Sequence, residues 1–268
     1  MRRVRLDAEL VRRGLARSRD HAAELIHAAR VTVAGQVATK PATAVDPAAP
    51  VVVRADVTDE NWASRGAHKL IGALGAFDMV VVSGARCLDA GASTGGFTDV
   101  LLRRGAREVV AVDVGYGQLI WRLQSDPRVT VIDRTNVRSI TAQDIGGPVD
   151  LTVSDLSFIS LRVVLPALIA CTDPAGDLVL MVKPQFEVGK DRLGAGGVVR
   201  DADLRVDAVR GVLAAATALG RGVAGVAASP LPGPSGNVEY FVHLRADVHR
   251  DAAEVEAAVR TAVAEGPQ

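Results

Sequence analysis

Residues 89–98 read DAGASTGGFT and follow directly on a short apolar run that starts at Arg86. The glycines in this turn allow the backbone to approach a ligand closely, and Asp113 closes the next apolar run 22 residues after Gly91. An acid at this spacing binds the hydroxyls of a ribose, whereas a dinucleotide enzyme would show GxGxxG here. The turn therefore predicts a nucleoside-type site. An ordinary strand-to-helix turn is the alternative, and the two acids that flank the turn, Asp89 and Asp113, favour the site.

Short apolar runs alternate with helical stretches from residue 80 onward. They span residues 86–89, 109–113, 129–133, 151–155 and 178–183. Apolar strands that alternate with helices are typical of an α/β fold whose parallel sheet is covered on both faces. Four of these runs end in Asp and the fifth in Lys, and ligands of such sheets bind beyond the carboxyl ends of the strands. We therefore expect these polar residues to meet at one edge of the sheet.

The N-terminal segment has a different pattern. Two short helical patterns, one starting near Arg5 and one after Ser18, precede an alternating stretch at 31–37 that predicts a hairpin. This segment resembles the S4 domain, a small α+β RNA-binding module. We expect an S4-like domain at residues 1–59, an interdomain linker at 60–65 and a second domain at 66–268.

Charge is distributed unevenly along the 268 residues, although the formal net charge is zero. Residues 1–45 hold nine Lys and Arg against four Asp and Glu, which leaves 22 against 27 in residues 46–268. A basic segment docks on polyanions through phosphate contacts, although a solvated arginine face explains the same charge. The S4 resemblance implies that the basic face contacts folded ribosomal RNA. The residues that would form it are Arg3, Arg5, Arg17, Arg19 and Lys40.

The glycine-rich turn resembles motif I of S-adenosylmethionine methyltransferases. That resemblance implies a Rossmann-like domain with a seven-stranded, mostly parallel sheet and S-adenosyl-L-methionine as its cofactor. Residues after the third strand would reach toward the adenine ring. The cofactor-binding residues implied in this way are Asp89, Gly91, Ala92, Ser93, Thr94, Gly95, Gly96, Phe97, Asp113, Asp133, Arg134 and Asn136.

Lysine is scarce, with four residues against 27 arginines. Unlike Arg, Lys can lose its proton in a protein and take part in proton transfer. Two of the four lysines join two acids in a spacing that resembles the Lys-Asp-Lys-Glu tetrad of FtsJ-like RNA 2′-O-ribose methyltransferases. The tetrad residues are Lys69, Asp155, Lys183 and Glu239. Structural ion pairs are the alternative interpretation of these four residues.

The tetrad has a chemical rationale, because a ribose 2′-hydroxyl must lose its proton as it attacks a methyl group. Lys183 is the candidate base. Asp155 and Glu239 would hold that amine and the ribose in register, and Lys69 would stabilise developing negative charge. Because four coupled groups titrate jointly, the division of roles between the two lysines stays open.

Longer stretches around the tetrad resemble the TlyA family, also called haemolysin A. They read SRGAHKL at 64–70, DLSFIS at 155–160, KPQFEVG at 183–189 and SPLPGPSGNVE at 229–239. The resemblance implies 2′-O-methylation of cytidine in 16S and 23S ribosomal RNA within the 30S and 50S subunits, with an effect on capreomycin and viomycin susceptibility. Phe158 would stack on a flipped base or pack in the core, and Arg65 and Arg138 would contact RNA or lie free on the surface.

Several functional classes are disfavoured by composition. Apolar residues make up 49% and charged residues 23%, which excludes a disordered chain. No apolar run approaches a membrane span, and no signal peptide is recognisable, so we expect a cytoplasmic protein without stable membrane association. The five histidines and two cysteines lack metal-ligand spacing, which predicts no metal site. The alternatives to an enzyme are a membrane-lytic haemolysin and a non-catalytic RNA-binding ribosome-assembly factor.

Overall fold

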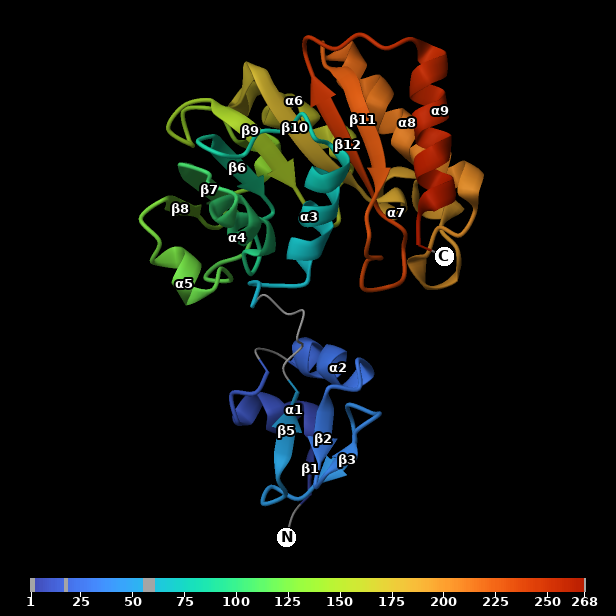
Figure 1. Cartoon of the computed structure of the whole chain (residues 1–268). Coiled ribbons are helices and arrows are strands. Elements are labelled where there is room, and N and C mark those ends of the chain that lie inside the picture. The colour runs from blue at the N-terminus through green and yellow to red at the C-terminus, as the bar shows by residue number, and fades with distance from the viewer. Residues whose placement is uncertain (1–2, 17–18, 55–60, 268) are drawn as a thin grey trace. The chain divides into compact units, whose positions relative to one another are not determined.

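The computed structural model describes residues 3–16, 19–54 and 61–267. The chain forms two compact units, with the division between Asn61 and Trp62 (Figure 1). Ala63 is buried in the larger unit, where its amide donates to Asp99 Oδ2 at 2.9 Å, and the Arg103 guanidinium stacks 4.0 Å from the Trp62 ring centroid. Residues 62–63 therefore pack with the larger unit.

The smaller unit packs two helices against short strands. The predicted hairpin at 31–37 is confirmed, because Ala34 and Gly35 both adopt positive φ, 49° and 83°, which suits a tight turn. The helices bury Leu6, Leu10 and Ile26. Its elements are β1 (Val4–Arg5), α1 (Leu6–Arg12), α2 (Arg19–His27), β2 (Val31–Val33), β3 (Gln36–Val37), β4 (Ala44–Val45) and β5 (Val51–Val53).

The larger unit is built on a seven-stranded sheet in the order β11-β12-β10-β9-β6-β7-β8. Every neighbouring pair is parallel except those that involve β12, so β12 alone runs against the others in this sheet. This confirms the predicted seven-stranded, mostly parallel sheet. Its strands are β6 (Arg86–Ala90), β7 (Glu108–Val112), β8 (Val129–Ile132), β9 (Val149–Ser154), β10 (Thr172–Val182), β11 (Gly222–Ala228) and β12 (Tyr240–Arg245).

Helices cover both faces of this sheet (Figure 1). Because side chains alternate across a strand, Leu88 packs in the core with α6, α8 and α9, whereas Cys87 packs in the core with α3 and α4. The helices begin at side-chain caps where the sequence supplies them, as at Asp251, which forms a capping box with Glu254. The helices are α3 (Gly66–Ala76), α4 (Gly96–Arg103), α5 (Trp121–Gln124), α6 (Leu161–Cys171), α7 (Pro184–Glu187), α8 (Ala202–Ala218) and α9 (Ala252–Glu265).

The order of the strands reverses beside β6. From β6 the chain proceeds to β7 and β8 on one side, and then returns to β9 on the other. Open α/β sheets bind ligands at such a switch point, beyond the carboxyl ends of the strands. Gly91 follows β6 there with φ 91°, and a Cβ at this position would lie 2.7 Å from the Asp155 carbonyl oxygen. Only glycine fits this close approach of the two strand ends.

Candidate active site

The four tetrad residues form one continuous row of alternating charge. The Lys69 amine donates to Glu239 Oε2 at 2.5 Å and lies 4.0 Å from Asp155 Oδ2. The Lys183 amine lies 2.6 Å from Asp155 Oδ1 on the other side. The row therefore runs Glu239, Lys69, Asp155, Lys183, and it contains two amines and two carboxyls.

The topology of the sheet explains why residues so distant in the chain meet here. Asp155 and Lys183 follow the neighbouring parallel strands β9 and β10, so both lie at the carboxyl edge. Glu239 precedes β12, and because β12 is antiparallel to β10, its first residue, Tyr240, pairs with Val182 at the end of β10. Lys69 comes from the first half of α3.

The row is shielded from water. Lys69 and Lys183 are each 8% exposed and Glu239 is 1% exposed, while Asp155 is half-buried. Buried charges are costly unless each has a partner, and removing one partner leaves an uncompensated charge. The ion-pair interpretation and the site interpretation thus describe the same contacts. What the row offers chemically is an amine beside a carboxylate that stabilises its protonated form.

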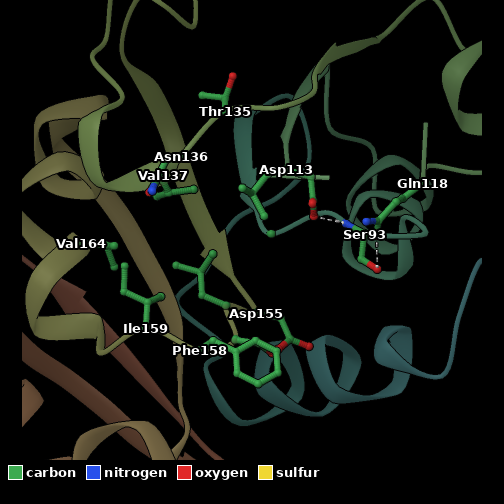
Figure 2. Close-up of a pocket in the computed structure, with 14 residues that line it drawn as sticks. Ser93, Asp113, Gln118, Thr135, Asn136, Val137, Asp155, Phe158, Ile159 and Val164 are labelled. Atoms are coloured by element: carbon green, nitrogen blue, oxygen red, sulfur yellow. Dashed lines mark hydrogen bonds between the residues drawn. The ribbon is translucent and has the colours of Figure 1, made fainter. Parts of the chain in front are cut away.

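A cavity of about 480 Å³ opens at the switch point, and Asp155 belongs to its lining as well as to the row of charges (Figure 2). Four of the twelve predicted cofactor residues line it, namely Gly91, Ser93, Asp113 and Asn136. Its volume is in the range of pockets that hold small organic ligands. The lining residues that the sequence did not single out as catalytic, cofactor or RNA contacts are Val114, Gln118, Thr135, Val137, Leu156, Ser157, Ile159 and Val164.

Asp113 is fixed in position by two backbone donors. The amide of Ser93 donates to Asp113 Oδ2 at 2.8 Å, as Figure 2 shows, and the amide of Gly115 donates to Asp113 Oδ1 at 2.7 Å. Ser93 itself adopts a positive φ of 48°, which is uncommon outside glycine. The turn thus holds the carboxylate at the cavity wall before any ligand binds.

Two further predicted cofactor residues hold the loop that follows Asp113. Asp133 Oδ2 accepts from the Gly117 amide at 2.8 Å, and the Arg134 guanidinium stacks 4.2 Å from the Tyr116 ring centroid. Neither Asp133 nor Arg134 lines the cavity. The loop also carries Gln118, which reaches the cavity and which its position shortly after Asp113 could have indicated.

The second half of the glycine-rich turn packs against other parts of the larger unit. Gly96 and Phe97 are buried in the first turn of α4, Gly95 and the earlier Ala92 are buried before it, and Thr94 is half-buried. A Cβ on Gly96 would lie 2.3 Å from Ser64 Oγ and 3.0 Å from the Ala67 amide nitrogen. Glycine at this position lets α4 begin directly against the segment that leads into α3, the helix that carries Lys69.

Asp89 is a fully buried carboxyl at the end of β6, next to the turn. Thr98 Oγ1 donates to Asp89 Oδ2 at 2.6 Å, whereas Asp89 Oδ1 has no hydrogen-bond partner among the described residues. Burial raises the pKa of Asp89 from its ordinary value of 3.8 to about 7, opposed by the Thr98 hydrogen bonds. The Oδ1 atom thus lacks a partner directly beside the glycine-rich turn.

Most predicted RNA-binding residues are exposed. Arg3, Arg5, Arg19 and Lys40 lie on the surface of the smaller unit, and Arg65 and Arg138 lie on the surface of the larger one; Arg17 falls outside the described residues. Arg5 and Arg19 both contact Asp7 Oδ2, at 2.7 and 3.0 Å, and these arginines hold the pKa of that carboxyl well below its usual range.

Phe158 stands at the rim of the cavity, close to Asp155 (Figure 2). Its side chain is 91% exposed, and its φ of 65° is strained for an aromatic residue. Among the described residues, its ring contacts one other aromatic ring, that of Phe186, and the two ring centroids lie 5.4 Å apart. Of the two interpretations of Phe158, this exposure disfavours a place in the core.

The raised pKa of Asp89 predicts a pH-dependent stability. The unfolded chain loses this proton near pH 3.8, and the folded chain keeps it up to about pH 7. Asp89 therefore contributes stability that is complete below pH 3.8 and declines as the pH rises to about 7. The variant Asp89→Asn carries an amide that does not titrate, so we expect it to lack this decline. In the wild type the decline amounts to up to about 4 kcal/mol of the free energy of unfolding.

The measurement is urea denaturation of both proteins from pH 4 to 8 without ligand. We expect the wild type to lose stability relative to Asp89→Asn across this window, with no further divergence above pH 7. Parallel curves for the two proteins would show that Asp89 is ionised in the fold throughout.

Comparisons with known proteins agree with this geometry. A family model of FtsJ-like methyltransferases matches residues 62–246, and a model of the S4 domain matches residues 4–51. The Mycobacterium tuberculosis protein named 16S/23S rRNA (cytidine-2′-O)-methyltransferase TlyA is 60% identical over 268 residues, which cover 99% of each chain. Hemolysin A of Brachyspira hyodysenteriae is 34% identical, with 90% of this chain and 99% of that protein covered.

A solved structure from Streptococcus thermophilus shares the whole fold. It superposes with a TM-score of 0.78 at 35% identity and covers 99% of this chain and 96% of that chain. The predicted resemblance is thus confirmed on sequence and on structure. The chain belongs to the FtsJ-like methyltransferases, within the TlyA family that joins this domain to an S4 domain.

Proposed function

We propose that this protein transfers a methyl group from S-adenosyl-L-methionine to the 2′-hydroxyl of cytidine ribose in ribosomal RNA. The observation that carries the proposal is the position of Asp155, which lines the cavity and also lies between Lys69 and Lys183 in the row of charges. A donor in the cavity would thereby lie beside the group that handles the proton. The name of the Mycobacterium tuberculosis relative supports ribosomal RNA cytidine as the substrate.

The residues of the cavity fit the proposed cofactor. The clamped Asp113 carboxylate would accept hydrogen bonds from the ribose hydroxyls, and Asn136, in the loop after the neighbouring strand β8, would contact the adenine. The Asp89 carboxyl beside the turn has an oxygen without a partner among the described residues, and it would ionise to balance the positive charge of the cofactor. When bound, the cofactor supplies an electrophilic methyl group on a sulfonium.

The row of charges would then serve proton transfer. As the 2′-oxygen forms its bond to the methyl carbon, the carbon–sulfur bond breaks and the hydroxyl proton passes to Lys183 Nζ. Asp155 Oδ1, 2.6 Å away, stabilises the ammonium that results. Lys69 stabilises negative charge on the 2′-oxygen, and Glu239 holds Lys69 in place.

The RNA substrate would bind through separate sets of residues. Arg3, Arg5, Arg17, Arg19 and Lys40 of the S4 domain would contact phosphates, which position an enzyme without reading sequence. In the other domain, Phe158 would stack on the target base, and Arg65 and Arg138 would contact the backbone. We place the targets in both subunits, 16S RNA of the 30S and 23S RNA of the 50S, with an effect on capreomycin and viomycin susceptibility and a cytoplasmic location.

The alternatives lack a supporting observation. None of the helices in the described part of the chain is long and apolar enough to span a membrane. A ribosome-assembly factor that only binds RNA would need neither a shielded row of two amines and two carboxyls nor a cavity that shares Asp155 with it.

Substitution of Lys183 tests the function directly. Lys183→Ala removes the amine, whereas Lys183→Arg keeps the positive charge beside Asp155 but cannot give up its proton. We expect both variants to lose at least about 100-fold in the rate of methyl transfer, the scale of general base catalysis. The measurement is single-turnover incorporation of labelled methyl groups into isolated 30S and 50S subunits, with the methylated nucleoside identified as 2′-O-methylcytidine.

Cofactor affinity, measured by calorimetry, serves as the control and is expected to stay near the wild-type value. An active Lys183→Arg variant would rule out Lys183 as the proton acceptor. Wild-type protein that methylates neither subunit would rule out the function.

The S4 contacts are tested by a pair of arginines on the smaller unit. Arg5→Ala removes a proposed phosphate contact, so we expect weaker binding to every RNA substrate and a salt-dependence slope that falls by about 1. Arg12→Ala is the matched control, because Arg12 is also an exposed arginine of the smaller unit paired with a nearby carboxylate, Glu9, and is not one of the proposed phosphate contacts. Equal losses in the two variants would argue against a specific phosphate contact at Arg5.

A further inference from the structure

Lys183 has a second neighbour that the tetrad does not include. Its amine donates to Ser157 Oγ at 2.9 Å, in addition to its contact with Asp155 Oδ1 at 2.6 Å. Ser157 is exposed and lines the cavity, two residues after Asp155 on the same loop. One amine nitrogen is thus held by two oxygens from a single loop.

The hydrogen bond to Ser157 matters because of the geometry of an amine. A neutral primary amine has two N–H bonds and one lone pair. The contact with Asp155 Oδ1 is an ion pair without hydrogen-bond geometry, so by itself it does not fix the rotation about the Cε–Nζ bond. The hydrogen bond to Ser157 Oγ directs one N–H bond at the serine and leaves two tetrahedral directions for the lone pair, and attraction of the other N–H bond to Asp155 selects between them.

We propose that Ser157 is a positioning residue of the methyl-transfer reaction, which fixes the rotation of the Lys183 amine and directs its lone pair at the ribose 2′-hydroxyl. The inference rests on the proposed function and adds a fifth residue to the tetrad. Ser157 acts through Lys183, and the proton still passes from the 2′-oxygen to Lys183 Nζ.

The surrounding structure holds Ser157 at a defined place. Glu187, buried at the end of the segment that begins with Lys183, accepts from Ser160 Oγ and from the Leu161 amide, both at 2.7 Å. The loop that follows β9 is therefore tied to the Lys183 segment at both of its ends. Burial raises the pKa of Glu187, against these hydrogen bonds and the nearby Arg162.

Several charges surround the Lys183 amine. Asp155 is its direct partner, and Lys69 and Glu239 continue the row from α3 and from the start of β12. Ser157 is the uncharged member of this set. Its removal therefore leaves the balance of charges intact and isolates the effect of orientation.

The test compares Ser157→Ala with Ser157→Thr in single-turnover methyl transfer by the full-length protein to 30S and 50S subunits. We expect Ser157→Ala to lower the plateau rate constant about tenfold or more, the scale of a hydrogen bond to a charged group. The affinities for S-adenosyl-L-methionine and for the subunits should stay within about twofold. Ser157→Thr, which keeps a hydroxyl, should restore most of the rate.

The pH–rate profile provides the readout that a loss of folded protein would not move. A hydroxyl that accepts from Lys183 stabilises the ammonium, so Ser157→Ala should shift the rising limb to lower pH while it lowers the plateau. Ser125→Ala serves as control, because Ser125 is exposed at the end of α5 and its hydroxyl donates to the Trp121 carbonyl. This control should match the wild type in rate and profile.

Ser157→Ala at the wild-type rate would overturn the proposal, as would a loss that Thr does not restore or a profile whose limb stays in place. These results would leave the proposed function standing, provided that wild-type protein methylates the subunits and Lys183→Ala does not. If the wild type methylates neither subunit, the function fails and the role of Ser157 fails with it.

Discussion

Burial of two amines at the carboxyl edge of the sheet is the constraint on which the site depends. Removing an ammonium group from water costs several kcal/mol unless it is paired and hydrogen-bonded. Lys69 and Lys183 meet this requirement with the two carboxyls Glu239 and Asp155. Each partner lies in or next to a different element, so the ion pairs also tie α3, β9, β10 and β12 together.

The reversed strand follows from the same requirement. Glu239 reaches the row because β12 runs against its neighbours and therefore starts where they end. A parallel strand in its place would bring the opposite end of that strand to the site. The close packing of Gly91 against the Asp155 backbone then joins the row to the cavity. One residue, Asp155, thus connects the proposed donor pocket with the proposed proton acceptor.

Much of this arrangement could be predicted from the sequence, because periodicity and strand-end polarity carry topological information. The apolar runs that end in Asp or Lys became strands β6 to β10. Of their polar ends, Asp155 and Lys183 are in contact, and Asp113 and Asp155 line the same cavity. The exact pairing within the tetrad could not be predicted, since it depends on loop paths. The ion pairs of the tetrad are what both interpretations of these residues expect, so the contacts do not separate a structural role from a catalytic one.

The features of the site that could not be predicted from the sequence lie in its loops. Asp133 and Arg134 looked like cavity residues from their position after a strand, but a backbone amide and a tyrosine ring engage them. Ser157 gave no signal, because an exposed serine in a loop is ordinary and its contact with Lys183 exists only in three dimensions. The positive φ of Phe158 likewise gave no signal, because an aromatic residue rarely adopts this conformation.

The central claim is that the row of charges acts as a unit around Asp155, and a double-mutant cycle on its two lysines tests this most directly. Single-turnover rates of methyl transfer would be measured for Lys69→Ala, Lys183→Ala and the double variant. If the lysines serve one proton-handling unit, the double variant should be no slower than the slower single variant, within about threefold, because groups that act together lose their effect together. A double variant whose loss equals the product of the two single losses would show that the lysines act independently, and would contradict the account.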